Sequence, residues 1–342
     1  EAAPGPAPRP VLPRLEKQEL PELARRGSPV LALDYGDSGT EKLLAVAQVV
    51  NGRQEVRAAR LTQTRGLLGA GRVRLEATYD LSDRISGRVQ RLLVDRQANS
   101  VVVSTDQGQI HYFRREGPDL QWRQSFQPFA DRPRPEVTWM DYLLGDVTLV
   151  LSNPEGLIRL YSLYRPEGQQ DRLFGWIRTL PPLHGPPHCY ARSQRNKAFV
   201  LAHGDQVRLC YGTTETVRWE AQFPEAVQLV ALNSKYDRLA ILGQTGRLEL
   251  WRLDDPHPEA SIRAFFGKLW YEGADRPRYE WQSTGGSDDF EPKLSLVPLM
   301  VGTLKGTFYA LVFAVPVALL GAVYVSQFAP PKFRSVAKPV ME

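Results

Sequence analysis

The residues that could bind a metal lie close together in one short segment. His184 and His188 are separated by a Gly-Pro-Pro run, and Cys189 follows directly. A His-x3-His pair next to a cysteine has the ligand types of a zinc site. However, the glycine and the two prolines break any helix that would place both rings on one face. No second group of ligands stands nearby in the sequence, so we interpret the segment as a loop and expect neither metal nor cofactor.

Two cysteines, Cys189 and Cys210, are the only thiols of the chain. An oxidising compartment would allow a disulfide between them. Two buried free thiols are the alternative, because their spacing does not report whether the geometry of a disulfide is met. No G-x-S-x-G, Walker A or H-E-x-x-H motif occurs in the sequence, and these motifs carry nucleophilic, nucleotide and zinc chemistry. We therefore expect a protein that is not an enzyme.

The composition excludes two further classes of protein. Of the 342 residues, 42% are hydrophobic and 24% are charged, which is typical of a globular chain and excludes a wholly disordered one. Lys and Arg number 43 against 38 Asp and Glu, a net charge of +5. Because this excess is small and no block of five basic residues occurs, we expect no binding to nucleic acid.

A repeated pattern indicates β-structure over residues 29–255. Each repeat has an apolar strand, a polar turn with a glycine, and a second alternating strand that ends in an aromatic residue. The four turn glycines are Gly108, Gly156, Gly204 and Gly246. Alternation on both sides of a glycine turn predicts a hairpin, and a period near 45 residues is typical of a propeller blade. A fifth, weaker hairpin turns at Asn51-Gly52.

We therefore predict a mainly β, β-propeller-like domain of five to seven blades, followed by a transmembrane α-helix. The aromatic residue at the end of each second strand resembles the layout of WD40-type blades, although the Trp-Asp dipeptide of those blades is absent. An irregular β-sandwich is the alternative. Residues 1–28, with six prolines, are predicted to be a semi-rigid linker with at most a short helix near Glu16–Arg26. Residues 256–293 are predicted to be a connecting segment.

The strongest signal is a run of 26 residues without charge, from Gly306 to Pro331. About 20 helical residues span the hydrocarbon core of a membrane, so we predict a transmembrane helix over residues 306–328. A buried helix of a soluble protein is the alternative. The landmarks of this segment and its approach are Gly302, Gly306, Pro316, Gly321 and Tyr324. Pro316 is expected to kink the helix, and residues 294–305 are predicted to be a separate interfacial segment, with one long tilted helix as the alternative.

The flanking charges predict an orientation. Lys332, Arg334 and Lys338 follow the apolar run, without an acidic residue before Glu342. Because cytoplasmic flanks are enriched in Lys and Arg, residues 329–342 are predicted to be cytoplasmic. Residues 1–290 would then lie on the outer, periplasmic side.

The sequence from Gly267 onward resembles the permease subunit of phosphate-type ABC importers, the PstC-like branch. The matching pieces are Asp289–Lys293, Leu296–Leu299, Gly302–Thr307, the run Ala314–Tyr324 and Lys332–Arg334. The resemblance implies a multi-pass protein of the bacterial inner membrane with a large extracytoplasmic insert between its first two helices. The chain would then be an internal fragment, with one membrane helix before Glu1 and several after Glu342.

The resemblance also implies a function and a set of partners. It implies phosphate import, with ATP hydrolysed by a separate ABC ATPase subunit and with a second permease subunit and a periplasmic substrate-binding protein as further partners in the lipid membrane. The propeller-like domain would serve interaction or regulation. The alternative function is a membrane-anchored β-propeller that binds other proteins and has no transport activity.

Overall fold

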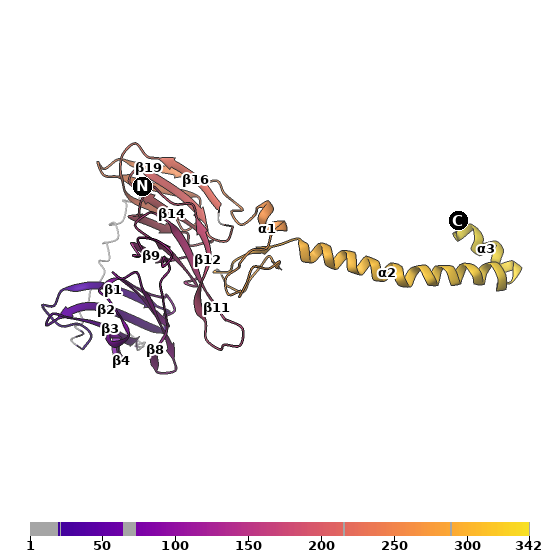
Figure 1. Cartoon of the computed structure of the whole chain (residues 1–342). Helices are drawn as coiled ribbons and strands as arrows, with labels where there is room; N and C mark the ends of the chain where they lie inside the picture. The colour runs from indigo at the N-terminus through magenta and orange to yellow at the C-terminus, as the bar shows by residue number, and fades with distance from the viewer. Residues whose placement is uncertain (1–19, 21, 64–72, 215, 288, 342) are drawn as a thin grey trace, which may run out of the picture. The chain divides into compact units, whose positions relative to one another are not determined.

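A computed structural model describes most of the chain (Figure 1). The described residues are 20, 22–63, 73–214, 216–287 and 289–341. The chain divides into two compact units, Glu1–Val137 and Thr138–Glu342. This division lies inside the predicted domain of residues 29–255, and each unit is described below by itself.

The first unit holds two antiparallel sheets of four strands each, in sequence order. The first sheet consists of β1 (Val30–Asp37), β2 (Glu41–Val50), β3 (Arg53–Gln63) and β4 (Val73–Asp80). Asn51 and Gly52 connect β2 to β3 with φ values of 51° and 75°. Positive φ at both central residues is the requirement of a type I′ hairpin turn, so the predicted fifth hairpin is confirmed.

The second sheet follows a short 3-10 helix, η1 (Ser82–Arg84). Its strands are β5 (Val89–Val94), β6 (Ser100–Thr105), β7 (Ile110–Glu116) and β8 (Asp119–Phe126). Small and β-branched side chains from both sheets form one apolar core, including Val56, Ala58, Val101 and Val103, all fully buried. Their small size lets the two sheets of this unit pack closely.

The described part of the predicted linker differs from the prediction. Most of the predicted linker, and of the short helix allowed near Glu16–Arg26, lies outside the described residues. Residues 22–28 form turns, and the amides of Leu23 and Ala24 donate to the carbonyl of Leu20. Leu23 is only 2% exposed and packs with Val46 and Leu61 on one face of the first sheet. The boundary at residue 28 is therefore wrong, because this face of the sheet needs an apolar cover and Leu23 supplies it.

The second unit begins with three more antiparallel sheets in sequence order. The third sheet consists of β9 (Trp139–Tyr142), β10 (Thr148–Ser152), β11 (Ile158–Tyr164) and β12 (Leu173–Leu180). The fourth consists of β13 (Cys189–Arg192), β14 (Ala198–His203), β15 (Gln206–Tyr211) and β16 (Thr216–Gln222). The fifth has three strands, β17 (Val227–Leu232), β18 (Arg238–Gly243) and β19 (Leu248–Arg252).

The repeated antiparallel meander confirms the predicted mainly β, propeller-like class, and the described residues hold five such sheets. The predicted turn glycines connect the second and third strands of their sheets with φ between 56° and 89°. At Gly156 an added Cβ would also lie 2.6 Å from the carbonyl oxygens of Leu183 and Gly185. Only glycine satisfies both the conformation and the close approach of backbone at that position.

The sheets of the second unit pack face to face. One core lies between the third and fourth sheets and includes Leu160, Phe199 and Cys210. A second core lies between the fourth and fifth sheets and includes Val200 and Ile241. The two inner strands of the fourth sheet, β14 and β15, are therefore buried on both faces, which explains the almost continuous apolar run of β14.

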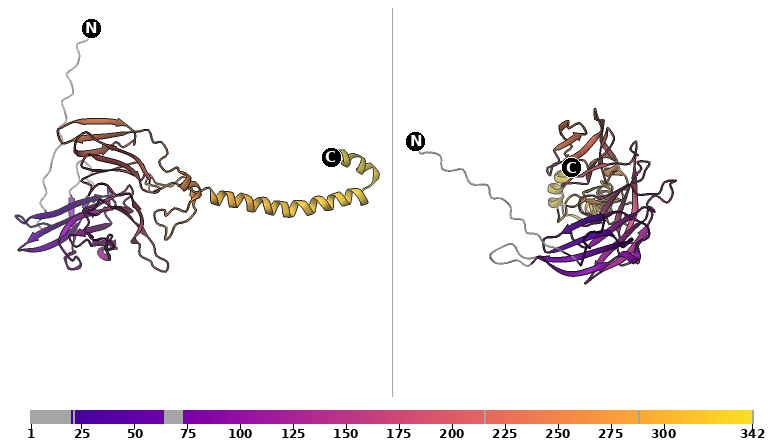
Figure 2. Two further views of the ribbon diagram at one scale, coloured as in Figure 1. Left: turned by 45° about the horizontal axis from the view of Figure 1, so that its top comes forward. Right: turned by 90° about the vertical axis from the view of Figure 1, so that its left-hand side faces the viewer.

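The chain beyond the fifth sheet carries α1 (Ile262–Phe266) and a two-stranded sheet of β20 (Trp281–Gln282) and β21 (Lys293–Leu294). The helix α2 (Val297–Val323) follows and passes through Pro316 without interruption (Figure 2). A π-helical turn η2 (Tyr324–Phe328) and α3 (Pro331–Met341) complete the described chain. The predicted break after residue 305 is wrong, because Pro298 lies in the first turn of α2, where a helix needs no amide hydrogen.

Candidate functional site

The apolar helix is the most exposed part of the described chain. No residue of α2 is buried. Among the described residues, Val297–Phe328 is the one helical stretch that is long and apolar enough to cross a membrane. Of the predicted landmarks, Gly302, Gly306, Pro316 and Gly321 lie within α2, and Tyr324 begins η2. An uncovered apolar helix of 27 residues needs an apolar environment, either lipid or other helices.

The basic flank that was predicted to be cytoplasmic lies in one element. Lys332, Arg334 and Lys338 are all residues of α3. This helix begins three residues after η2 ends, with Ala329 and Pro330 between them. The structure thus places the basic residues directly beyond the apolar stretch, whereas the side of the membrane on which they lie stays a prediction.

The segment that leads into α2 is bonded to the sheets at several points. Buried Arg178 on β12 donates to the backbone carbonyls of Gly212 and Trp270. The amide of Leu296 donates to the carbonyl of Phe265 at 2.8 Å, and Ser295 is fully buried. The predicted connecting segment of residues 256–293 is therefore packed structure and not a free tether.

A buried ion pair lies at the centre of this attachment. The Nζ atom of Lys197, a residue only 1% exposed, is 2.7 Å from Oε2 of Glu272 and donates to the carbonyl of Leu144 at 2.6 Å. The Thr148 hydroxyl donates to Oε1 of Glu272 at 2.7 Å. Burial raises the pKa of Glu272, while Lys197 opposes this shift. Because each charge is compensated, the pair can hold two segments together in a low-dielectric interior.

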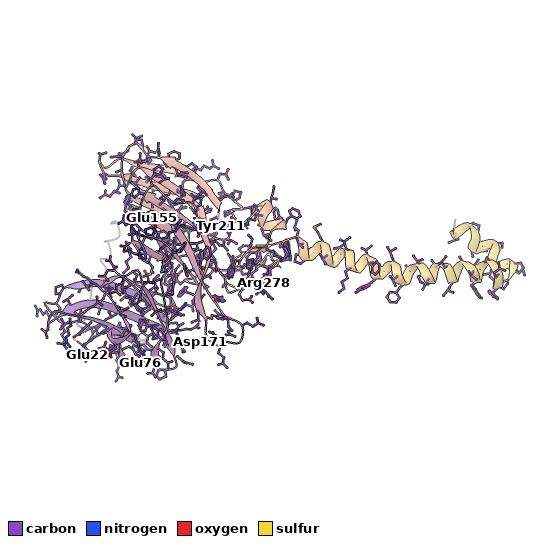
Figure 3. The ribbon with its side chains drawn as sticks, viewed as in Figure 1. Glu22, Glu76, Glu155, Asp171, Tyr211 and Arg278 are labelled. Atoms are coloured by element: carbon purple, nitrogen blue, oxygen red, sulfur yellow. The ribbon has the colours of Figure 1, made fainter. Side chains whose placement is uncertain are left out.

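A second carboxylate extends the same network. Glu291 is 7% exposed; it accepts from the hydroxyl of Thr213 and, at 2.7 Å, from the amide of Glu272. Burial and the nearby Glu291 carboxylate raise the pKa of Tyr271 to about 12 and raise that of Tyr211, labelled in Figure 3, still further. We name this set the clamp; its members are Thr148, Arg178, Lys197, Thr213, Glu272 and Glu291.

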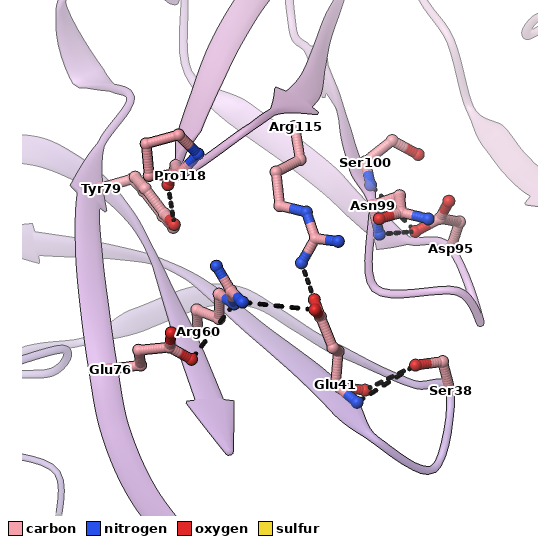
Figure 4. A network of polar contacts seen from close by, with 10 residues as sticks. All are labelled: Ser38, Glu41, Arg60, Glu76, Tyr79, Asp95, Asn99, Ser100, Arg115 and Pro118. Carbon is pink, nitrogen blue, oxygen red and sulfur yellow. Dashed lines mark hydrogen bonds and ion pairs between the residues drawn. The ribbon is translucent and has the colours of Figure 1, made fainter.

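The first unit has its own polar network (Figure 4). Glu41 on β2 accepts from Arg60 on β3 at 3.2 Å and forms an ion pair with Arg115 on β7. Arg60 also contacts Glu76 on β4 at 3.3 Å. The Tyr79 hydroxyl donates to the carbonyl of Pro118 at 2.6 Å. These contacts join the two sheets of the unit and leave the charges compensated, so their role is structural.

A pocket of about 310 Å³ opens between the fourth and fifth sheets. Its apolar wall includes Trp219 and Trp251, whose ring centroids are 5.3 Å apart. Its polar wall includes Arg218, whose Nη2 atom lies 2.5 Å from Oδ1 of Asp255. Two indole rings beside a neutralised ion pair form a surface that suits a large apolar side chain.

The two cysteines are free thiols. Cys189 lies on β13 and Cys210 on β15, with β14 between them, and they face Ala202 and Phe199, three residues apart on β14. Their Cα atoms are therefore more than two strand spacings, about 9–10 Å, apart. A disulfide needs about 4.4–6.8 Å, and the two side chains also face different cores. The disulfide is therefore wrong for this structure, and the alternative of two buried thiols describes it.

His188 of the predicted loop and His203 at the end of β14 contact backbone carbonyls, and the amide of His184 donates to Oε1 of Gln206 at 2.9 Å. The Nε2 atom of His188 lies 2.6 Å from the carbonyl oxygen of Val227. The Nδ1 atom of His203 lies 2.7 Å from the carbonyl of Pro186. No group of three or more His, Cys, Asp or Glu side chains suited to a metal occurs in the part of the chain that the structure describes.

Sequence reasoning missed the clamp and the pocket. The clamp left no local signal, because Lys197 and Glu272 are far apart in the sequence. The pocket had a signal that could have been read. Three fourth strands each contain a tryptophan, Trp122, Trp176 and Trp219, and this recurrence marks the position at which each sheet is completed.

Comparison with known proteins supplies similarities of fold only. No protein-family model and no curated protein matches the chain. The structure is similar to the β-propeller domain of Cps50 (Swd1) from Myceliophteria thermophila, with a TM-score of 0.44 and 10% identity over 66% of this chain and 84% of that one. It is also similar to Sqt1 from Chaetomium thermophilum, with a TM-score of 0.49 and 10% identity over 68% and 59%. At these values neither similarity indicates a function.

Proposed function

We propose that the chain is a membrane-anchored, propeller-type module that binds another protein and carries out no catalytic step. The observation that carries the proposal is the attachment of the exposed apolar helix α2 to the blade-like sheets through the clamp. A helix that was only a flexible anchor would not need a buried ion pair between Lys197 and Glu272 at its root. Sheets bonded to a membrane helix can hold a binding surface at a defined place near the lipid.

The anchor is tested by placing a charge in the apolar helix. Leu311 is 56% exposed near the middle of α2, and an arginine at the centre of a membrane helix costs about 2.5–3.5 kcal/mol. We expect Leu311→Arg to release a large part of the chain from membranes on alkaline carbonate extraction. Ile262→Arg, at a residue of α1 that is 81% exposed, is the control and should stay in the membrane fraction. Complete extraction of the unaltered chain would refute the anchor.

We also propose that the sheets face the outer, periplasmic side and that α3 lies in the cytoplasm. The proposal is supported by the basic residues of α3 and the positive-inside rule. Single cysteines at exposed Ser38 and Ser335 can be labelled with a membrane-impermeant maleimide in intact spheroplasts. Ser38→Cys should react and Ser335→Cys should not, whereas the reverse pattern would invert the topology. The two native thiols are buried and should stay silent.

A second candidate function is that of a permease subunit for phosphate import. The supporting observation is that Gly302 and Gly306 lie four residues apart on α2, all of it exposed. This spacing lets another membrane helix approach closely. The hydroxyls of Thr303 and Thr307 donate to carbonyls one turn earlier at 2.9 Å. An ABC ATPase subunit, a second permease subunit and a periplasmic substrate-binding protein would then be the partners.

Phosphate uptake by cells that carry the full-length protein tests this second function. Gly306→Leu should lower uptake at least tenfold because the added side chain blocks helix packing, while Val315→Leu on the same helix should leave it near normal. Equal uptake by both variants, or full uptake without the protein, would refute the permease function. Neither result would bear on the membrane-anchored module.

A further inference from the structure

The fifth sheet lacks the strand that completes the four before it. Each of the first four sheets has four strands, whereas the fifth ends at β19. No strand of the described residues pairs with the outer edge of β19. An open edge of this kind offers unpaired backbone groups to an added strand.

The completed sheets show what the added strand would place beside β19. In three of them, the residue five positions after the turn glycine faces a tryptophan on the fourth strand. These pairs are Phe113 with Trp122, Tyr161 with Trp176 and Leu209 with Trp219. A bulge lies next to each pair. Trp251 holds the same position after Gly246, and in the described chain no residue faces it across the open edge of β19.

The side chains of β19 are also more exposed than the equivalent side chains of the complete sheets. Phe113 and Leu209 are each 1% exposed, while Trp251 is 41% exposed. Leu248 and Leu250 on β19 are 68% and 69% exposed. The equivalent residues in the second and third sheets are at most 1% exposed; they are Ile110, Tyr112, Ile158 and Leu160.

The pocket beside the open edge of β19 lies where the aromatic side chain of a fourth strand would point, and its lining is apolar enough to hold that side chain. Trp251 pairs with Leu239 on β18, and both line the pocket together with Leu209 and Trp219. A residue that faces Trp251 on an added strand points to the same side of the sheet. The pocket volume of about 310 Å³ is large enough for an indole ring.

Charge at the open edge indicates the chemistry of the partner strand. Arg252 lies directly opposite Arg238 in the register of β18 and β19, and like charges in that position destabilise a sheet. Asp237 lies 4.0 Å from Arg238 at an exposed site. A carboxylate next to the bulky residue of the added strand would compensate Arg252, as Glu220 does for Arg208 in the fourth sheet.

We propose that β19 and the pocket between Trp219 and Trp251 bind an extended segment of a separate protein. That segment adds a fourth antiparallel strand, inserts a tryptophan or similar aromatic side chain into the pocket, and carries an acidic residue beside it. A second copy of this chain is not the occupant, because a stable dimer buries about 800 Å² per partner, whereas the exposed large apolar side chains of β19 are Leu248, Leu250 and Trp251. Residues 1–13 are not the occupant either, because they hold five prolines, and a proline has no amide hydrogen to donate to a strand ladder. The inference rests on the proposed protein-binding function, and it identifies the outer edge of β19 and the adjoining pocket as the binding surface.

A labelled peptide tests the proposal directly. The probe has the sequence of residues 216–223 with Arg218→Glu, so that an acid precedes the tryptophan, and its binding to the full chain in lipid nanodiscs is followed by fluorescence anisotropy. We expect saturable binding with a dissociation constant below about 1 mM. A peptide with Trp219→Ala, and one N-methylated at its ladder amides, should each bind at least tenfold more weakly. These changes lie in the peptide and leave the protein fold unaltered.

Protein variants and hydrogen exchange complete the test. Arg252→Glu should weaken binding at least threefold, whereas Arg132→Glu, at an exposed arginine of the first unit, should not change it. The peptide should also slow amide exchange in β19. The proposal is overturned if binding is not saturable or if the N-methylated peptide binds equally well. It is also overturned if a peptide binds only after residues 1–19 are deleted, because those residues would then be the occupant of the edge. Such a failure would leave the result for Leu311→Arg in membranes unchanged, so the anchor is judged separately.

Discussion

Lys197 and Glu272 lie 2.7 Å apart and join the fourth sheet to the segment that leads into the apolar helix. Lys197 precedes β14, and Glu272 lies between α1 and β20. Their attraction offsets the cost of burying two charges, and the Thr148 hydroxyl satisfies the second carboxylate oxygen. The stability of the second unit should therefore depend on both partners being present.

Lys197→Met should destabilise the second unit by about 3–5 kcal/mol, because it leaves the buried carboxylate of Glu272 without its counter-charge. Chemical unfolding, followed by tryptophan fluorescence, measures the change. The double variant Lys197→Met, Glu272→Gln should recover most of the loss. If the single variant is as stable as the unaltered chain, the ion pair does not hold the segment.

The same carboxylate predicts a pH dependence. Burial raises the pKa of Glu272 in the folded chain above its ordinary value of 4.5. Between 4.5 and the raised value the folded state binds the proton more tightly than the unfolded state does. The contribution of this group to the free energy of unfolding is therefore full below pH 4.5 and is lost as the pH rises through the folded pKa.

Unfolding in urea at a series of pH values, with the Glu272→Gln variant beside the unaltered chain, isolates this contribution. The difference in unfolding free energy between the two proteins should change with pH in the stated direction. A difference that is constant across the series would contradict the raised pKa. Comparison with the variant is essential because other carboxyl groups titrate in the same range.

Two turn glycines should respond differently to alanine. At Gly204, with φ of 56° and no atom within 4 Å of an added Cβ, alanine should cost about 1 kcal/mol for the left-handed conformation. At Gly156, with φ of 75°, the same Cβ would meet two carbonyl oxygens at 2.6 Å. Gly156→Ala should therefore cost roughly 2 kcal/mol more than Gly204→Ala. Thermal unfolding of both variants checks the order, and equal losses would show that the backbone beside Gly156 moves freely.

Both thiols should be unreactive in the folded chain. Burial raises the pKa of Cys210 to about 12 and also raises that of Cys189, so little thiolate forms at neutral pH. Ellman's reagent should find no thiol in the native protein and both of them after denaturation. Finding none in the denatured, non-reduced protein would mean that a disulfide has formed.

In the first unit, Glu41 should matter more than Glu76. Glu41 contacts two arginines from different sheets, with 27% of its side chain exposed, while the Glu76 side chain is 42% exposed and contacts one. We expect Glu41→Gln to cost about 1–2 kcal/mol and Glu76→Gln less than about 1 kcal/mol. Chemical unfolding of the two variants at low and moderate salt measures the two changes in the free energy of unfolding. Equal changes for the two variants would contradict the role of Glu41 in joining the two sheets.

The parts of the fold that were predictable are those that depend on local chemistry. The hairpins at Gly108, Gly156, Gly204 and Gly246 follow from a turn residue and period-2 alternation. The presence of the long apolar helix and its end at Phe328 could also be predicted from the absence of charge. Its start at Val297 could not, because Lys305 interrupts the apolar run without interrupting the helix.

The clamp and the cysteine geometry depend on the register of strands and on contacts between distant segments. Cys189 and Cys210 are close in sequence, yet β14 separates them and turns their side chains toward different cores. Arg178 and Trp270 are distant in sequence, yet a guanidinium–carbonyl bond joins them. Pairing of this kind leaves no periodic mark, so composition and spacing do not report it.

The chain is hydrogen-bonded up to the residue before the apolar helix α2 begins. Ser295 and Leu296 are hydrogen-bonded to Glu280 and Phe265, and α2 begins at the very next residue. A force applied along α2, such as the force that a change in bilayer thickness would exert on the proposed membrane anchor, would therefore reach these hydrogen bonds directly. We therefore expect the junction to be stiff. A force on α2 should be transmitted to the sheets of the second unit, and a force on the sheets to α2, before any residue at the junction unfolds.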